Sequence, residues 1–159
     1  MGDLVRARSL LEESVAVFRH GGLTALLAGQ SLAHLGVVVE ELGDDDRAGS
    51  MYREALTDLS RVEDRLNVAS LLESFASLAA KAGQPVRAFR LIGGADRLRE
   101  EIHSPRPLVS SPRHARTLQL AGRQLAPDIA DAELAAGRRM TWPDAVAYAL
   151  AEGDRRSPD

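Results

Sequence analysis

The residues that could carry chemistry in this 159-residue chain are its histidines, a cluster of carboxylates and a pair of serines. Histidines bind metals when several of them, alone or with cysteines, converge at fixed spacings. The chain has no cysteine, and its four histidines show no ligand spacing with one another: His20, His34, His103 and His114. We therefore expect no metal site, and we interpret these histidines as solvated or capping residues.

Neighbouring carboxylates can act as a general acid and a general base. Glu40 and Glu41 are followed closely by Asp44, Asp45 and Asp46, so such a pair has a candidate here. A helix that begins at the aspartates explains them better, because the helix dipole stabilises carboxylates at a helix N-terminus. We expect a charged helix end rather than a catalytic pair.

The other candidates lack the partners that catalysis requires. Ser110 and Ser111 have no histidine or aspartate at a spacing suited to an activated nucleophile. No glycine-rich phosphate-binding loop is present, and the glycines at 21–22 and 94 are interpreted as turn or repeat glycines. We therefore expect no catalytic residue, no cofactor and no enzymatic activity.

Composition places the chain among helical globular proteins. Its apolar share is 45%, its aromatic share is 4%, and its commonest residues include Ala, Leu, Arg and Glu, which enter helices readily. The net charge is −3, so we expect no direct binding to nucleic acid. No run approaches the ~18 apolar residues that span a bilayer, and no signal peptide is evident. We expect a soluble, cytoplasmic protein with no membrane partner.

Helical spacing of apolar residues predicts five helices in the first part of the chain, at about 2–20, 23–42, 44–62, 65–82 and 86–102. Glycines end three of them, at Gly21-Gly22, Gly43 and Gly83, and Pro85 opens the last.

The end of the chain departs from this pattern. Residues 103–112 contain three prolines and three serines and predict a loop. Helices are expected at 113–125 and at 128–136, the second closed by Gly137. A final helix begins after Thr141, whose hydroxyl can cap it, with Asp144 three residues further on. Trp142 is expected to anchor this helical cap, which covers 113–152, and 153–159 form a polar tail.

A repeat with a period of about forty residues runs through the first five helices. Gly-Asp with Arg-Ala at 2–7 recurs at 43–48, and Gly-Gln with Arg-Ala follows at 83–88. Small and large residues recur at matching places: Leu32, Leu35, Gly36 and Val39 before Ala48, Tyr52 and Ala55, then Leu72, Phe75, Ala76 and Ala79 before Ala88, Ile92 and Ala95. Small residues let antiparallel helices approach closely, while large ones fill the gaps between pairs.

This pattern resembles the tetratricopeptide (TPR) repeat over residues 1–102. The resemblance implies an all-α, right-handed solenoid with a half repeat at 1–22 and full repeats at 23–62 and 65–102. Two features depart from the family: the period is 40–41 instead of about 34, and Ser60 stands where a proline is usual. HEAT repeats have a period near forty but lack this placement of small residues.

The C-terminal part is similar to the end of large bacterial regulators of the STAND ATPase and LuxR-type class. The segments that carry this resemblance are Ala-Ala-Gly-Arg at 135–138 and Met-Thr-Trp-Pro-Asp-Ala-Val at 140–146. The class implies a sensor and scaffold arm, on which a bound protein or effector relieves autoinhibition. The ATPase and DNA-binding motifs of the class are absent from this chain.

In a TPR stack the first helix of each pair lines the concave groove. The positions that match are Gln30, Ala33, His34, Val37, Glu40, Glu41, Ser70, Glu73, Ser74, Ser77 and Lys81. They are either a binding surface for a protein, a peptide or a small effector, or merely the solvated face of these helices. Ala33 and Val37 stand where carboxylate-gripping TPRs carry polar residues, which argues against chaperone-tail binding.

The first helix has no partner helix before it, because the chain begins on the second helix of a repeat. Its uncovered side favours either a piece of a larger regulator or a free-standing adaptor that forms a homodimer through residues 2–20.

Overall fold

In the computed structural model the described residues are 2–20 and 25–151, and they form helices and their connections without any strand. The helices are α1 (Gly2–His20), α2 (Ala25–Glu41), α3 (Asp45–Arg61), α4 (Arg65–Lys81), α5 (Pro85–Glu101), the short 3-10 helix η1 (Leu108–Ser110), α6 (Ser111–Gly122), α7 (Pro127–Arg138) and α8 (Trp142–Leu150). The predicted all-α fold is therefore confirmed for this part of the chain. None of these helices is long and apolar enough to cross a membrane.

The chain divides into two compact units, Met1–Ser74 and Phe75–Asp159, which we call unit 1 and unit 2. The division falls inside α4. The predicted stop at Gly21-Gly22 and the predicted polar tail at 153–159 lie outside the described residues.

Helices α2 to α5 share one local design. Each has 17 residues, and each begins twenty residues after the one before it. The residue two positions after each helix has a positive φ: Gly43 (92°), Glu63 (53°), Gly83 (69°) and His103 (52°). The N–H groups of this residue and the next one donate to carbonyls of the last helical turn, as Gly43 does to Glu40 (3.0 Å). Glycine was expected at two of these ends, and side chains with a Cβ occupy the other two.

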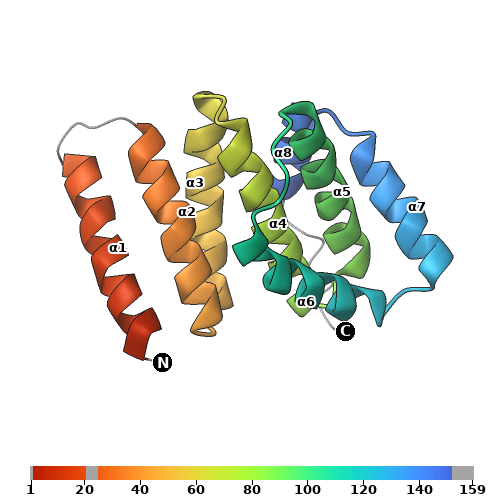
Figure 1. Cartoon of the computed structure of the whole chain (residues 1–159), viewed down its shortest axis with the longest axis horizontal. Helices are drawn as coiled ribbons and strands as arrows, with labels where there is room; N and C mark the ends of the chain where they lie inside the picture. The colour runs from red at the N-terminus through yellow and green to blue at the C-terminus, as the bar shows by residue number, and fades with distance from the viewer. Residues whose placement is uncertain (1, 21–24, 152–159) are drawn as a thin grey trace. The chain divides into compact units, whose positions relative to one another are not determined.

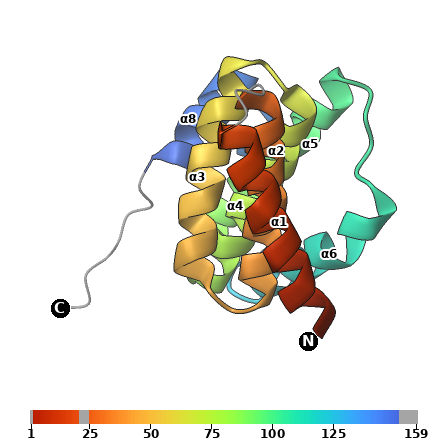
Figure 2. The same cartoon turned by 90° about the vertical axis from the view of Figure 1, so that its left-hand side faces the viewer.

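In unit 1 helices α1, α2 and α3 follow one another in sequence order (Figure 1), with α2 in contact with both neighbours. Figure 2 shows the same helices from the side of α1. Two glycines of α2 allow the approach to α3. A Cβ on Gly36 would lie 2.6 Å from Cε1 of Tyr52, and one on Gly29 would lie 2.9 Å from Cγ of Leu59. Ala48 and Ala55 of α3 are also fully buried. The small residues predicted at Gly36, Ala48 and Ala55 therefore lie at buried positions.

In unit 2 helix α5 is the central element, with α6, α7 and α8 each in contact with it. Figure 1 shows α7 beside α5. At their crossing the two backbones touch: a Cβ on Gly93 would overlap the carbonyl oxygen of Leu134, and a Cβ on Gly137 would overlap that of Arg90. The prediction that Gly137 closes this helix is wrong, because α7 continues to Arg138 and Gly137 is buried at the crossing.

The remaining cap follows the expected order with shifted boundaries. Helix α6 begins at Ser111 instead of 113, and η1 occupies part of the predicted loop. At the start of α8 the Thr141 hydroxyl accepts a hydrogen bond from the N–H of Asp144 (3.3 Å), which confirms the predicted cap. Trp142 is the first residue of α8 and is half-buried. Arg87 of α5 holds the end of α8 through the carbonyl oxygens of Ala149 and Ala151, at 2.9 and 2.8 Å.

We predict that Gly93→Ala and Gly137→Ala each destabilise the fold by about 1–3 kcal/mol or more, because the new methyl group meets backbone that cannot move aside without separating α5 from α7. Gly122→Ala is the matched control, since a Cβ there lies 3.9 Å from Phe89, an ordinary contact. Urea unfolding measures the difference. A crossing variant that is as stable as the control would contradict the close approach.

Candidate functional site

The predicted groove positions on α2 differ widely in exposure. His34 and Glu41 are exposed, Gln30 and Val37 are half-buried, and Ala33 and Glu40 are buried. Contact with α1 on one side and α3 on the other leaves α2 only a narrow open strip. The residues that could meet a partner on this helix are therefore His34 and Glu41, with Gln30 and Val37 beside them.

Glu40 has a structural use inside unit 1. Its side chain is 3% exposed, and its Oε2 accepts a hydrogen bond from the Tyr52 hydroxyl at 2.7 Å. Tyr52 is itself fully buried and lies against Gly36, one turn before Glu40. A buried carboxylate is costly unless it is hydrogen-bonded, so this contact ties Glu40 to the α2–α3 interface.

The predicted positions on α4 divide between the two units. Ser70, Glu73 and Ser74 belong to unit 1, where Ser70 and Glu73 are half-buried and Ser74 is buried. The hydroxyls of Ser70 and Ser74 donate to backbone carbonyls one turn earlier, those of Leu66 and Ser70. Ser77 and Lys81 belong to unit 2, where Ser77 is buried and Lys81 is exposed.

A hydrogen-bonded carboxylate links the starts of α2 and α4 in unit 1. Asp64 Oδ2 accepts from Gln30 Nε2 (3.0 Å) and from Asn67 Nδ2 (2.7 Å), and Oδ1 accepts from the N–H of Asn67 (3.2 Å). Partial burial acts to raise the pKa of Asp64, but the hydrogen bonds from Gln30 and Asn67 outweigh it and lower the pKa below 3.8. The ionised carboxylate therefore both caps α4 and holds Gln30.

We predict that Asp64→Ala lowers the free energy of unfolding by about 1–2 kcal/mol at pH 7, as loss of a capping carboxylate does. Because the pKa is lower in the folded state, this contribution is complete above pH 3.8 and is lost as the pH falls through the folded pKa. Urea unfolding at pH 7 and near pH 3 should therefore show a difference between wild type and variant that shrinks in acid. A constant difference would show that ionisation plays no part.

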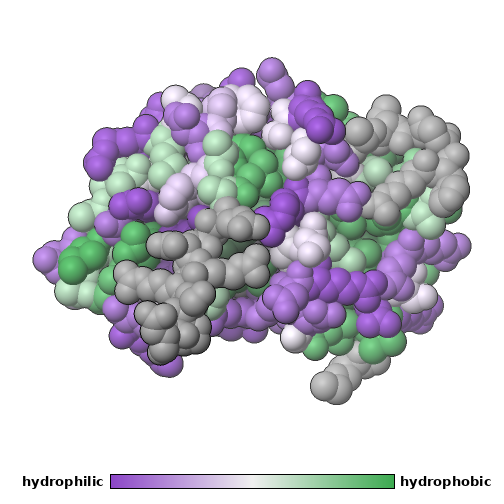
Figure 3. All heavy atoms as spheres, turned by 180° about the vertical axis from the view of Figure 1, so that it is seen from behind, coloured by the Kyte–Doolittle hydropathy of each residue, from purple (hydrophilic) through white to green (hydrophobic). Residues whose placement is uncertain are grey.

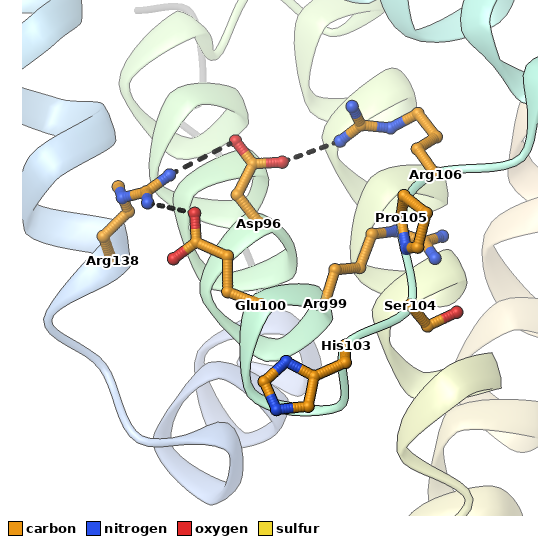
Figure 4. A pocket seen from close by; sticks show the side chains of 8 residues that line it. All are labelled: Asp96, Arg99, Glu100, His103, Ser104, Pro105, Arg106 and Arg138. Atoms are coloured by element: carbon orange, nitrogen blue, oxygen red, sulfur yellow. Dashed lines mark hydrogen bonds and ion pairs between the residues drawn. The ribbon is translucent and has the colours of Figure 1, made fainter.

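Unit 2 contains a charged pocket that no pattern in the sequence predicts. Its volume is about 530 Å³, and it is lined by Asp96, Arg99 and Glu100 of α5, Arg138 of α7 and the connection of residues 103–106. Figure 4 shows Asp96 between the guanidinium groups of Arg106 and Arg138. Arg106 Nη2 lies 2.8 Å from Asp96 Oδ1, Arg138 Nη1 lies 3.9 Å from Oδ2, and Arg138 also pairs with Glu100.

Burial in this pocket increases from its rim to its floor. Glu100 and Arg138 have side chains that are about half exposed and form the rim, while Asp96 and Arg106 lie deeper. Arg99 also lines the pocket and is 5% exposed, and its guanidinium group extends past Pro105 (Figure 4). His103, with its positive φ, turns the chain out of α5 so that Ser104, Pro105 and Arg106 form one wall.

A local sequence pattern brings together only some of the residues of this pocket. Asp96, Arg99 and Glu100 stand at positions i, i+3 and i+4, which places them on one face of a helix. Arg138 is 38 residues beyond Glu100 and reaches the pocket through the α5–α7 crossing, which no local pattern indicates.

The described residues include no group of three or more histidines, cysteines, aspartates or glutamates that could hold a metal ion. Comparison with family models, with curated proteins and with solved structures finds no match.

Proposed function

We propose that this chain is a non-catalytic, TPR-like binding module, the C-terminal sensor and scaffold arm of a bacterial transcriptional regulator or STAND-type ATPase. The observation that carries the proposal is the design of α2 and α3. Helices of equal length and with matching ends pack closely at small residues, as in a stacked hairpin repeat. Such arrays present exposed helix surfaces to partners.

The binding surface that we propose on unit 1 is centred on the exposed strip of α2. Its exposed polar groups are His34 and Glu41, and Glu73 lies half-buried on α4. Two carboxylates favour a partner with a basic segment, because complementary charge guides association and selects partners. The resemblance of residues 135–146 to the end of bacterial regulators supports placing this surface in a sensor arm.

A pull-down with the purified chain, followed by affinity measurement on the captured protein, tests this surface. We predict that Glu41→Lys with Glu73→Lys weakens binding by about tenfold or more, because like charges placed against each other cost several kcal/mol. Glu54→Lys on α3 makes the same substitution once, at an exposed position outside this surface, and should leave affinity unchanged. Glu40 is unsuited to this test, because its reversal would disrupt the bond to Tyr52. Equal affinity of the double variant and wild type would exclude the surface.

The second candidate function is a structural adaptor that self-associates through residues 2–20. Helix α1 favours it, because Val5, Leu10 and Val17 are each more than half exposed. On the side of the molecule drawn in Figure 3, hydrophobic residues lie in separate groups among hydrophilic ones. Exposed apolar residues that are scattered singly are ordinary on protein surfaces, so this candidate ranks second. Light scattering at high protein concentration tests it, and a clean monomer would exclude it.

A further inference from the structure

We propose that α1 pairs in antiparallel orientation with α1 of a second copy of this chain, so that Arg6 of each copy lies opposite Glu13 of the other. The proposal rests on and deepens the self-association described above as the second candidate function, because it assigns the residues, the orientation and the register of the contact. It uses none of the residues of the surface proposed on α2 and α4.

One row of exposed residues runs along most of α1. Its members are spaced three or four residues apart, which places them on one face of a helix: Arg6, Leu10, Glu13 and Val17. All four are exposed, Leu10 by 57% and Val17 by 55%. Val15, on the opposite side of the helix, is buried. Within unit 1 this row is therefore open to a partner on the side of α1 that faces the viewer in Figure 2.

The order of charges along this row makes it complementary to itself. Its cation, Arg6, stands in the N-terminal half of α1 and its anion, Glu13, in the C-terminal half, with Leu10 between them. A second copy turned end to end places its Glu13 opposite Arg6 and its Arg6 opposite Glu13, so both charge pairs form at once. A parallel pair would place like charges opposite each other, which opposes association. The charges therefore select the antiparallel orientation.

Leu10 supplies the apolar centre of the contact. With the two-fold axis beside Leu10, the two Leu10 side chains cover each other from water. Arg6 and Glu13 of the second copy are then offset by one residue, or about 1.5 Å along the helix, which these long side chains can bridge. Ser9 is exposed next to Leu10 and is small enough to let the helices approach. The contact thus has an apolar centre between two pairs of opposite charges.

The dimer is expected to be weak. Helix α1 has 19 residues and is about 28 Å long. One pair of such helices covers less than the ~1,200 Å² of the smaller stable interfaces. Exposed ion pairs add little attraction. The charge pairs therefore determine the orientation of the two copies more than the strength of their association.

Sedimentation equilibrium of the whole chain, at concentrations from about 10 μM to about 1 mM, measures the association. We predict a reversible monomer–dimer equilibrium for the wild type. Arg6→Glu and Glu13→Arg should each weaken it by about tenfold or more, because each variant places like charges together at both ends of the contact. Leu10→Ala should weaken it in the same direction, because it removes apolar area at the axis.

An equimolar mixture of Arg6→Glu and Glu13→Arg tests the antiparallel register directly. In a mixed pair the two carboxylates of one variant lie opposite the two guanidinium groups of the other. The mixture should therefore associate about as tightly as the wild type, although neither variant does so alone. Arg53→Glu and Glu54→Arg are the matched controls, because they make the same changes at exposed positions of α3 and should leave the association unchanged.

A wild type that stays monomeric over this range would overturn the proposal and exclude the adaptor function with it. Single variants that associate like the wild type, or a mixture that does not recover the wild-type affinity, would overturn the antiparallel contact alone. None of these results bears on the binding of a partner to α2 and α4, so the sensor-arm proposal fails separately.

Discussion

The close approach of helix backbones at glycine is the constraint on which the rest of this structure depends. In unit 2 the crossing of α5 and α7 has no room for a Cβ at either Gly93 or Gly137. Such contact is stabilised by dispersion forces and by the exclusion of water. It requires small residues and surfaces of complementary shape on both helices. In unit 1 the glycines of α2 make room for side chains and not for backbone. The ring of Tyr52 lies against Gly36, and the side chain of Leu59 lies against Gly29.

The α5–α7 crossing also explains how the charged pocket forms. Gly137 contacts the backbone at Arg90, and Arg138 is its immediate neighbour. With the two axes this close, the Arg138 side chain reaches Asp96 and Glu100 about one and two turns after Gly93. A wider spacing would draw the guanidinium away from both carboxylates. The absence of side chains at Gly93 and Gly137 therefore determines both the packing of α5 on α7 and the arrangement of charge in this pocket.

The sequence predicts local features of this fold well and tertiary ones poorly. Apolar spacing together with Gly43 and Gly83 places α2 to α5 to within about two residues, because helix periodicity and helix ends are local properties. Gly137 was assigned to a helix end, since a glycine at an end and one at a close crossing look identical in a single sequence. The charged pocket needs Arg138 beside Asp96, and that proximity exists only once α7 packs on α5.

The predicted groove also shows that the sequence predicts tertiary features poorly. The resemblance to TPRs selects positions by their place in a repeat, but burial depends on every neighbour that a helix acquires. Ala33 and Glu40 are both buried, and Glu40 is hydrogen-bonded to Tyr52 of α3, although the pattern counts both residues as groove-facing.

The residues with positive φ end helices α2 to α5, and one of them also lines the charged pocket. Four successive helices end in the same hydrogen-bonded turn, yet only two of the turns use glycine. A side chain with a Cβ is disfavoured in the left-handed region, by roughly 1–2 kcal/mol, so its retention needs a reason. At His103 the strained residue is also a residue of the pocket wall, and the turn aims the following segment so that Arg106 meets Asp96. Glycine would make this turn at lower cost but would leave the mouth of the pocket without its imidazole. The positive φ at His103 thus occurs where the chain turns toward Asp96, whereas Glu63 makes the same turn at an exposed position of unit 1.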